Sequence, residues 1–507
     1  MSTSRTASLR LDFLVIGGGE FLLFFLFFFW PAFSASAPFQ CGGFPQIWVF
    51  FAALTHVLYP GISGLAAAFA LARAGHRVRV LEKSETGLGR KAGGVRVPPN
   101  LSKILVEWGL EDELSQSTIR CKGSTFNSLE TGETIGYLEW NEDVMKETGG
   151  SFLLMHHEDL HRMLHRLATA AGAQVEFGKG VRAVHAPPEG QGQQPSVELE
   201  SGEAVSADII IGADGYRSIV RPVVLGEEDQ GEDVGMSVYT ATIPMSAMME
   251  DPDLRHFAEA PEWPMWMGDG RSILGAISEQ RPGQVYNVHL FWPDSGSDAE
   301  EGWDQEVPMD MDFGAYDLRI QKLMKLVPSA IRTKVVNREM IEEWVDESGR
   351  IVLIGDAAHP TLPGSTHGCS LALEDAAVFG TLFSRLKNWD QVPQLLEAYQ
   401  DLRQLRCTAV NQREVANKEL VQIPPGPMRH NRDEEMRKAM QSGHDHWDES
   451  KLKKQWDEIA EVFAYNAFDA SDDWYVSWGA IMEASRARAA CDDLSVQVEI
   501  ADAPAAP

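Results

Sequence analysis

Cysteine and positive charge are both scarce in this 507-residue sequence. There are only five cysteines, they are scattered, and no two of them form a Cys-x-x-Cys pair (Cys41, Cys121, Cys369, Cys407 and Cys491). Scattered cysteines in odd number favour a reducing compartment, which we take to be the cytoplasm, and they predict no structural metal site.

Basic residues are outnumbered by acidic ones. The chain has 44 Lys and Arg against 74 Asp and Glu, which gives a formal net charge of -30. Nucleic acid phosphates and anionic membrane surfaces repel such a chain, so we expect no nucleic acid partner. The length exceeds what one hydrophobic core usually organises, so two domains, or one domain with a large excursion, are expected.

The apolar runs near the N-terminus are too short to span a bilayer, which takes about 20 residues. They cover residues 21–33 and 47–59, and polar and glycine-rich sequence separates them. The first run, followed by Ser-Ala-Ser-Ala, imitates a secretory signal, but that interpretation would discard residues 11–19, which belong to the motif described next. Membrane contact is therefore expected only if residues 20–61 form an anchor.

A glycine-rich turn of the dinucleotide-binding type is split by residues 20–61. Residues 11–16 read as a buried strand, and the glycines at 17–19 turn the chain sharply. An alanine-rich helix and a second strand, which ends at Glu82, follow Gly61. Leaving out the intervening residues joins the halves into V-I-G-G-G-I-S-G-L, a G-x-G-x-x-G between a strand and a helix.

The rejoined motif predicts how a dinucleotide is held. A turn without side chains, formed by Gly17, Gly19 and Gly64, lets the backbone approach a pyrophosphate at the helix N-terminus. Without the insertion, Glu82 falls 23 positions after Gly17. This offset is close to the roughly 20 residues expected of the acid that accepts hydrogen bonds from a ribose.

Two origins of residues 20–61 are open. A retained in-frame intron is one, because Gly-Glu-Phe at the left border and Pro-Gly at the right can be encoded by GT and AG splice signals. A genuine hydrophobic hairpin or anchor is the other, although long insertions in compact domains are uncommon. If the segment interrupts a complete turn, Gly19 and Ile62 must lie only about 4 to 8 Å apart at Cα.

Two further motifs follow buried strands. Residues 212–221 read G-A-D-G-Y-R-S-I-V-R, and residues 355–360 read G-D-A-A-H-P. The second of these continues through Leu362 and Pro363 to Gly368 and the run Glu-Asp-Ala-Ala. Three motifs in this order and spacing resemble the aromatic-ring hydroxylases, the single-component flavoprotein monooxygenases that include salicylate hydroxylase. The resemblance covers about residues 11–406, apart from the insertion.

The resemblance implies a mixed α/β fold, with a Rossmann-like FAD-binding domain, a β-sheet substrate domain and C-terminal helices. The FAD-binding domain is expected in three parts, the substrate domain in two, and a helical region with a disordered tail after them. The expected boundaries are 1–118, 150–225 and 346–420 for the FAD-binding domain, 119–149 and 226–345 for the substrate domain, and 421–507 for the C-terminal region.

The resemblance also implies which residues hold the cofactor. Asp356 matches an aspartate that binds the flavin ribityl chain, and a helix that starts near Gly368 would point its N-terminus at the isoalloxazine ring. Asp214 belongs to a motif that serves both the flavin and the reduced nicotinamide. The remaining candidates are Gly94, in the stretch after the ribose acid, and two positions where an arginine is usual in the family (Lys103 and His157).

Three residues are candidates for catalysis and substrate contact. Pro363 matches a proline near the flavin ring and the substrate, Arg217 would orient the nicotinamide, and Tyr239 would line the substrate pocket. Structural alternatives stay open for several positions: Asp214 and Asp356 as caps or turn formers, and Arg217 as a surface ion-pair partner. An aromatic residue in a strand is usually part of the core, which applies to Tyr239 and to three tryptophans that could stack on an aromatic substrate (Trp263, Trp266 and Trp292).

The implied reaction is that of an FAD-dependent monooxygenase. NADPH or NADH reduces FAD, dioxygen adds at the flavin C4a position, and the hydroperoxide passes a hydroxyl group to a small aromatic or other electron-rich substrate. No metal ion is expected. A related flavin oxidoreductase, such as an epoxidase, a reductase or a halogenase, is an alternative, as is a catalytically dead protein in which the insertion breaks the dinucleotide motif.

Overall fold

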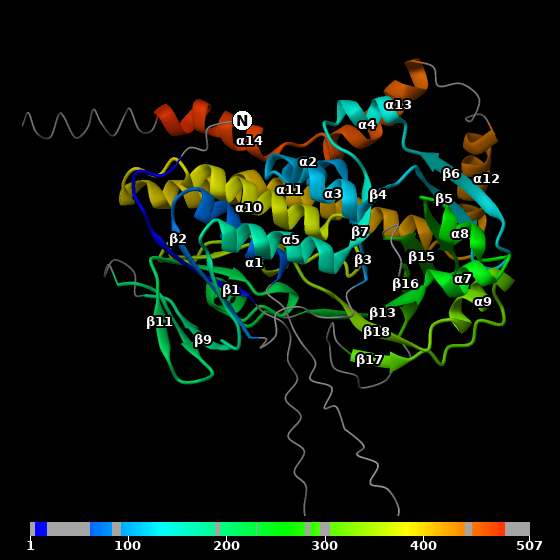
Figure 1. The fold of residues 1–507 in the computed structure, drawn as a ribbon, viewed down its shortest axis with the longest axis horizontal. Helices are drawn as coiled ribbons and strands as arrows, with labels where there is room; N and C mark the ends of the chain where they lie inside the picture. The colour runs from blue at the N-terminus through cyan, green and yellow to red at the C-terminus, as the bar shows by residue number, and fades with distance from the viewer. Residues whose placement is uncertain are drawn as a thin grey trace, which may run out of the picture.

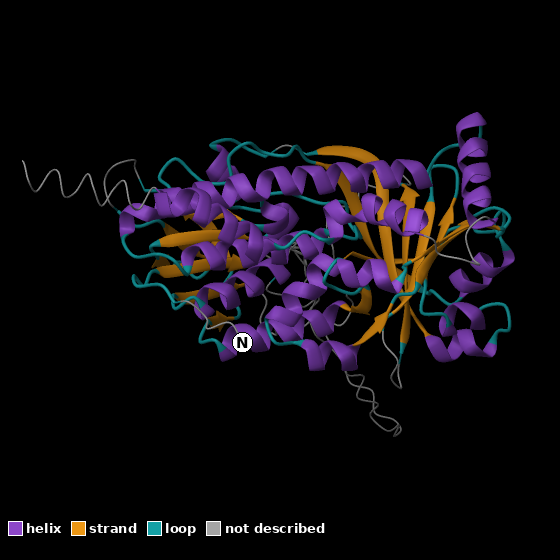
Figure 2. Cartoon of the chain, turned by 90° about the horizontal axis from the view of Figure 1, so that it is seen from above, coloured by secondary structure: helices purple, strands orange, loops and turns teal. Residues whose placement is uncertain are grey.

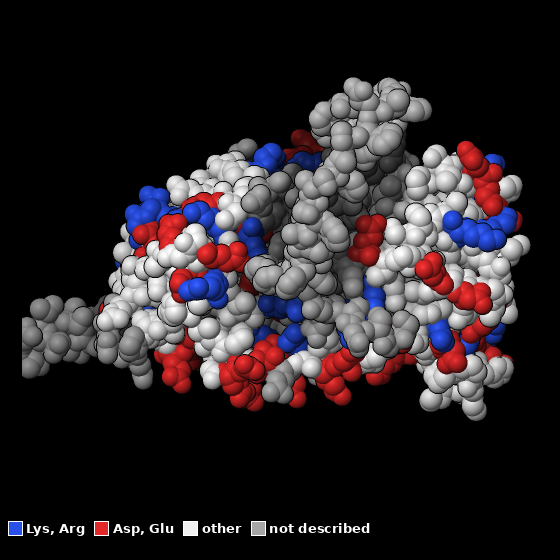
Figure 3. Space-filling view, turned by 90° about the horizontal axis from the view of Figure 1, so that it is seen from below, with Lys and Arg blue, Asp and Glu red and all other residues white. Residues whose placement is uncertain are grey.

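The computed structural model describes residues 6–17, 61–83, 93–187, 193–229, 231–278, 284–294, 305–441 and 449–481. Gly19 and most of the predicted insertion lie outside the described residues, so the predicted distance between Gly19 and Ile62 does too. Within the described ranges, no helix is both long and apolar enough to cross a membrane. Acidic side chains gather along one margin of the face in Figure 3, in keeping with the net charge of -30.

A five-stranded sheet, at the left of Figure 1, forms the first layer of the fold, in the order β19-β12-β1-β2-β8. All neighbouring strands in it are parallel. Its central strands are apolar and buried on both faces, as parallel sheets require. The strand bounds are β1 Asp12–Gly17, β2 Arg77–Glu82, β8 Gln174–Glu176, β12 Ile209–Ala213 and β19 Ile351–Leu353.

The predicted strand, helix and second strand of the dinucleotide motif are present. Helix α1 (Ile62–Arg73) begins one residue after Gly61 and connects to β2, which pairs with β1 in parallel. It packs on α10 (Gly368–Phe383) and α5 (His157–Ala170). Small residues allow this close packing, because a Cβ on Gly380 would lie 2.6 Å from the Cβ of Ala70.

An eight-stranded sheet forms the second layer, in the order β17-β18-β13-β16-β15-β14-β5-β6. Figure 2 shows the two main groups of strands toward opposite ends of the molecule with helices between them. Most of its strands fall in the predicted substrate region, and residues 119–149 contribute β5 and β6. The bounds are β5 Gly123–Ser128, β6 Thr134–Glu139, β13 Glu232–Pro244, β14 Trp263–Met267, β15 Ser272–Ile277, β16 Val285–Pro293, β17 Gln305–Pro308 and β18 Ser329–Asn337.

One face of the eight-stranded sheet carries its own hydrophobic core. Short helices contribute Met248, Phe257 and Leu323 to this core, which also holds Trp266 and Tyr286 from the strands. The opposite face is crossed by β3 (Gly94–Val97), because a Cβ on Gly94 would lie 2.7 Å from Asn287 Nδ2 of β16. The covering helices are α7 Met245–Glu250, α8 Arg255–Glu259 and α9 Leu318–Lys325.

Two three-stranded sheets complete the strand inventory of the described residues. One has the order β3-β7-β4, and the other, in the order β11-β10-β9, is a separate sheet near the five-stranded one (Figure 1). Their bounds are β3 Gly94–Val97, β4 Thr118–Arg120, β7 Leu153–His156, β9 Val181–His185, β10 Ser196–Leu199 and β11 Ala204–Ser206. The nearby helices are α2 Pro99–Glu107, α3 Glu111–Ser117, α4 Glu142–Glu147 and α6 Arg221–Leu225.

The C-terminal part is helical, as predicted, and folds back over the first layer. Helix α13 contacts α2 and α4, α14 packs on α10, and α12 contacts β6 of the second layer. Arg406 of α11 donates to the carbonyl oxygens of Glu461 and Val462, both at 2.7 Å, which fixes the end of α13. The bounds are α11 Val392–Val421, α12 Pro427–Gln441, α13 Glu449–Phe463 and α14 Ala467–Trp474.

Candidate active site

Four neighbouring strands end at one edge of the parallel sheet with residues of the predicted cofactor site. Glu82 ends β2, Gly17 ends β1, Asp214 follows β12, and Asp356 follows β19 by three residues. Carboxyl ends of parallel strands share one edge, and strands lie about 4.8 Å apart, so these residues span about 14 Å. The structure thus brings Glu82, Asp214 and Asp356 to one edge, as a shared binding groove requires.

The first helix of this edge offers free backbone donors. Gly61 precedes α1 and supplies no side-chain cap, and the first turn of the helix has no acidic residue. A Cβ on Gly64 would lie 3.4 Å from Val15 Cγ1 and 3.6 Å from the Cβ of Ala213, so the helix start lies directly on the strands. Uncapped N–H groups at a helix N-terminus bind anions, and this turn therefore fits the pyrophosphate of a dinucleotide.

Glu82 lies at the sheet end of this turn. It is the direct Cα partner of Gly17 in the pairing of β1 with β2, and its side chain is 0% exposed. A carboxylate at the end of the second strand, next to the glycine turn, has the position of a ribose ligand in dinucleotide-binding folds.

Asp356 is held in a tight turn that only glycine permits. Gly355 has a φ of 61°, and a Cβ there would collide with the hydroxyl of Ser63 in α1. Asp356 Oδ1 accepts hydrogen bonds from the backbone N–H of Thr361 at 3.2 Å and from its hydroxyl at 3.0 Å. Burial raises the pKa of Asp356. Among the described residues, Oδ2 accepts no hydrogen bond, which leaves it for a ligand hydroxyl.

The loop from Thr361 to Gly368 connects this turn to α10. A Cβ on Gly368 would lie 2.9 Å from the Thr361 hydroxyl, so the start of α10 packs tightly on the Asp356 turn. On its other side the loop faces the eight-stranded sheet, because a Cβ on Gly364 would lie 3.6 Å from Phe291 and 3.7 Å from His289. Pro363 therefore lies between the expected flavin site and the second layer.

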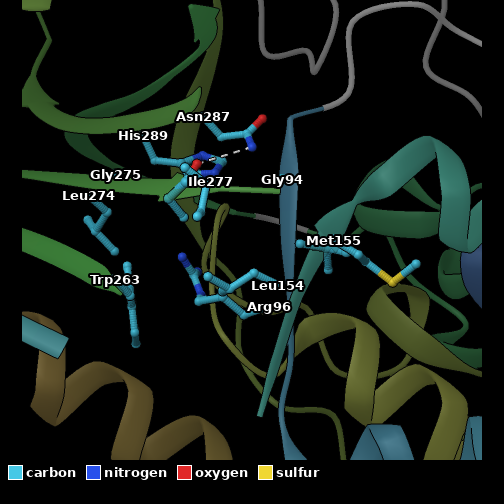
Figure 4. A pocket seen from close by; sticks show the side chains of 12 residues that line it. Gly94, Arg96, Leu154, Met155, Trp263, Leu274, Gly275, Ile277, Asn287 and His289 are labelled. Atoms are coloured by element: carbon cyan, nitrogen blue, oxygen red, sulfur yellow. Dashed lines mark hydrogen bonds between the residues drawn. The ribbon is translucent and has the colours of Figure 1, made fainter. Parts of the chain in front are cut away.

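A pocket lies beside this loop, between β3 and the eight-stranded sheet (Figure 4). Arg96 of β3, Trp263 of β14, Leu274 of β15 and His289 of β16 are among its walls. Its free space is about 10 Å³, room for about one water molecule, so an aromatic ring enters only when these walls move apart. Gly94 makes the close approach possible, because a Cβ there would lie 2.7 Å from Asn287 Nδ2.

Of the two titratable side chains in this pocket, His289 is neutral and Arg96 is charged. Burial lowers the pKa of His289 to about 3, with Arg96 acting in the same direction, so its imidazole is neutral. His289 Nδ1 shares a hydrogen bond of 3.1 Å with the hydroxyl of Thr240. Burial also lowers the pKa of Arg96, to about 10, which leaves this guanidinium protonated at neutral pH.

Tyr239, which is predicted to line the substrate pocket, does not line this pocket. Along β13, Val238 and Thr240 face β3 and the pocket, whereas Tyr239 is buried in the core on the opposite face. Two of the three candidate tryptophans, Trp266 and Trp292, also pack on that opposite face. Trp263 alone of the three lines the pocket.

The side chain of Asp214 serves the chain itself. It accepts hydrogen bonds from the Ser218 hydroxyl at 2.5 Å and from the N–H groups of Ile219 at 2.7 Å and Val220 at 3.3 Å. Both oxygens are thus used to cap the turn after β12, and burial raises the pKa of Asp214. These bonds fit the structural interpretation of Asp214 as a turn former, and its contact with the cofactor stays a prediction.

Arg217 lies in the same turn but is exposed and does not line the pocket. Its role in orienting the nicotinamide stays a prediction, as does the alternative of a surface ion pair. The buried guanidinium of Arg221, a few residues further on, donates to the carbonyl oxygens of Ala357 and Ala358 at 3.1 and 3.0 Å. It ties the second motif to the third.

Lys103 and His157 occupy the two positions where an arginine is usual in the family. Lys103 Nζ donates to the carbonyl oxygens of Thr148 at 2.8 Å and Ala464 at 3.0 Å, so its ammonium group joins the end of α4 to the residue after α13, and its contact with the flavin stays a prediction. His157 begins α5, and its backbone N–H donates to Gly93 at 3.1 Å. Burial lowers the pKa of His157 to about 4, so a neutral ring replaces the positive charge of an arginine.

A buried charge network behind the Asp356 turn escaped the sequence analysis. Asp375 of α10 accepts from His359 Nε2 at 2.6 Å and pairs with Arg403 Nε of α11 at 2.8 Å. Glu374 pairs with Arg403 and Arg406. His359, Asp375 and Cys407 lie close enough to hold a metal ion. However, both carboxylate oxygens of Asp375 already have charged partners, which fits an ion-pair network.

The fold and this edge define a dinucleotide-binding α/β protein with a covering sheet. A family model described as FAD binding domain matches residues 60–414. FAD-dependent monooxygenase OpS4 of Beauveria bassiana (strain ARSEF 2860) is 26% identical over 398 residues, which cover 75% of this chain and 88% of that protein. The 3-amino-4-hydroxybenzoate 2-monooxygenase of Streptomyces cremeus is 28% identical over 393 residues, covering 77% of this chain and 93% of that protein.

Solved structures share the fold. CtdE, crystallised in complex with FAD and a substrate, has a TM-score of 0.69 at 16% sequence identity and covers 94% of this chain and 100% of its own. The family match spans well over half of the sequence. This chain therefore belongs to the FAD-binding domain family, and it is an FAD-dependent monooxygenase of the aromatic-ring hydroxylase family.

Proposed function

We propose that this enzyme uses NADPH or NADH and dioxygen to hydroxylate a small aromatic or other electron-rich molecule. The observation that carries the proposal is the position of the pocket. It opens between β3 and the second layer, beside the loop that joins Asp356 to α10. A substrate in this pocket would lie next to a ring held by that loop.

Known relatives support the substrate class. The Streptomyces cremeus relative is a 3-amino-4-hydroxybenzoate 2-monooxygenase, and this chain matches it over most of its length. The pocket itself combines an aromatic wall, Trp263, with the polar groups of Asn287 and His289. Such a wall and a few placed polar groups are typical of sites for small aromatic ligands.

The roles we propose for the cofactor site follow from its geometry. When bound, FAD supplies the oxygen chemistry. The uncapped N-terminus of α1 at Gly64 would bind the pyrophosphate, Glu82 the ribose, and Asp356 Oδ2 a hydroxyl of the ribityl chain. The N-terminus of α10 at Gly368 would stabilise negative charge on the isoalloxazine ring. Pro363 would pack against this ring and the substrate.

The rest of the site would exclude water and admit the nicotinamide. Gly94 lets β3 lie close to Asn287, which closes the pocket on the side of the second layer. Arg217, which is exposed, would orient an incoming nicotinamide, and His157 would contact the flavin as a neutral hydrogen-bonding group. The expected domain boundaries remain part of this proposal.

The experiment is to purify the full-length chain, measure FAD per chain, and follow NADPH and NADH oxidation with a panel of phenols and hydroxybenzoates. Isotopically labelled dioxygen should place one labelled atom in the product. Substrate-stimulated oxidation without a hydroxylated product would favour a reductase, and an epoxide or a halogenated product would favour those alternatives. A folded, colourless protein that takes up no FAD would favour a catalytically dead product.

A further inference from the structure

Arg96 is the only arginine that lines the pocket within the described residues. Its side chain extends from β3 toward Trp263 (Figure 4), and the guanidinium carbon lies 4.6 Å from the centre of that indole ring. Nη2 donates to the carbonyl oxygen of Gly364 in the loop beside the pocket. One hydrogen bond and one aromatic ring thus fix the direction of this cation.

Its positive charge is not matched by an acid in contact. The residue is only 8% exposed, and Nε has no hydrogen-bond partner. No carboxylate of the described residues forms a salt bridge with it. Glu414 of α11 is near enough to affect its pKa, but burial raises the pKa of Glu414 itself, and that carboxylate lies against His367 Nε2 at 3.7 Å.

Burying a charge without a partner is costly, so such groups are normally paired or neutral. Arg96 is neither: its pKa of about 10 keeps it charged at neutral pH. A buried guanidinium that faces a ligand pocket with donors to spare is suited to a carboxylate or a phenolate, which it binds in one plane. Trp263 in turn stacks on Phe152, with ring centres 6.3 Å apart, which supports the indole ring beneath the guanidinium.

We propose that Arg96 is the residue that recognises a negatively charged group on the substrate. The inference rests on the proposed function, because it places the substrate of that reaction in this pocket. The substrate would then be an aromatic anion, with its carboxylate or phenolate on Arg96 and its ring beside Trp263. The unpartnered oxygen of buried Asn287, Oδ1, would accept a hydroxyl or amino hydrogen from the same ring.

The test uses the FAD-loaded full-length chain and two probes of equal shape, benzoate and benzamide, titrated by calorimetry. We expect benzoate to bind about 10- to 100-fold more tightly than benzamide, as a charge-assisted pair allows. Arg96→Gln should remove this preference, and Arg96→Lys should retain part of it. FAD per chain should stay the same in both variants.

Arg271→Gln is the matched control, because Arg271 also lies over a tryptophan, Trp292, at 5.2 Å, but on the opposite face of the sheet. It should leave the benzoate preference unchanged. A wild-type chain that binds benzoate no better than benzamide, or that binds neither, overturns the proposal. So does an Arg96→Gln variant that keeps the preference, or one that loses FAD, since the arginine would then hold the cofactor.

These outcomes separate the inference from the function on which it rests. A wild-type chain that prefers benzoate but oxidises no NADPH or NADH with any aromatic compound contradicts the proposed function alone. A chain that hydroxylates neutral phenols and shows no preference for benzoate contradicts the role of Arg96 alone.

Discussion

Nε2 of His359 lies 2.6 Å from Oδ2 of Asp375, and the same oxygen accepts the backbone N–H of Gly355 at 2.8 Å. One buried carboxylate therefore holds both ends of the turn that presents Asp356. Arg403 fixes the other oxygen of Asp375 at 2.8 Å. Because this contact lies behind the cofactor edge, its ionisation state should affect the stability of that edge.

The first prediction concerns pH. Burial alone would lower the pKa of His359, but Asp375 raises it well above its ordinary range. The pKa of Asp375 is lowered by His359 and Arg403 against the effect of burial. The histidine therefore contributes stability that is full below about pH 6.5 and is lost as pH rises through its raised pKa. The aspartate contributes stability above about pH 4 that is lost at lower pH.

His359→Gln should consequently lower the free energy of unfolding most between about pH 4 and 6.5, and less as pH increases toward the raised pKa. Urea denaturation at a series of pH values measures this difference. The exposed His185 serves as the control, and His185→Gln should leave the profile unchanged. A His359→Gln deficit that grows with increasing pH would show that the histidine is neutral in the folded protein.

The second prediction separates two aspartates that look alike in sequence. Asp356→Ala should lose most of the bound FAD and keep most of the fold, because it removes a carboxylate with one oxygen left for a ligand. Asp214→Ala should keep FAD and lose about 1 to 2 kcal/mol of stability, as the loss of a cap does. FAD absorbance per chain and chemical denaturation measure the two effects. The reverse result would return Asp214 to the cofactor site.

A third prediction concerns the turn glycine. Gly355→Ala should both destabilise the chain and reduce FAD content, because the new Cβ meets Ser63 of α1 at a φ of 61°. Gly202→Ala is the control: its φ is 84°, but a Cβ there meets nothing within 4 Å. That variant should cost only the backbone strain, about 1 to 2 kcal/mol, and should bind FAD normally. Equal effects of both changes would mean that the contact with Ser63 is unimportant.

The cofactor edge could be predicted from sequence because its signals are local. An apolar strand, a glycine turn and an acid follow one another within a few residues, as at Gly17 or Asp356, and their order fixes their place at one edge of a parallel sheet. The three motifs were also enough to predict the mixed α/β fold, through the family that they resemble. Such glycines and acids rarely occur in this order by chance.

The substrate side could not be predicted in this way. Strand alternation places Tyr239 and Thr240 on opposite faces of β13, but it does not say which face meets the other layer. That choice depends on how β3 crosses the sheet, a contact between residues far apart in sequence. Arg96 was missed for the same reason: a single arginine in a short apolar strand reads as an exposed position until the crossing is known.

A fourth prediction tests which face of β13 and β15 meets the substrate. Leu274→Trp should fill the little free space of the pocket and lower kcat/KM at least tenfold, because Leu274 is one of its walls. Tyr239→Phe should leave kcat/KM within about twofold, because its ring packs in the core behind the sheet. Steady-state NAD(P)H oxidation with the best phenol of the panel measures both. A large loss in Tyr239→Phe would return that hydroxyl to the pocket.

The last prediction concerns the chain that joins β1 to α1. Gly17 is the Cα partner of Ala213, and a Cβ on Gly61 would lie 3.4 Å from the carbonyl oxygen of the same alanine. The two ends of the connection therefore flank one residue of β12. Three steps of about 3.8 Å join Gly17 to Ile62 when residues 20–61 are deleted, a reach of about 11 Å, which suffices for neighbours of one strand end.

A chain that lacks residues 20–61 should thus close the glycine turn without strain, with Gly19 joined to Ile62, and bind FAD at least as fully as the complete chain. Its melting temperature should not decrease, because the pairing of β1 and the packing of α1 are kept, and Gly19 takes the place of Gly61, whose carbonyl oxygen accepts the N–H of Leu65. FAD per chain and thermal denaturation of both forms measure this. A shortened chain that folds but holds less FAD than the complete one would show that the segment belongs to the cofactor site, and the interpretation as an interruption would be wrong.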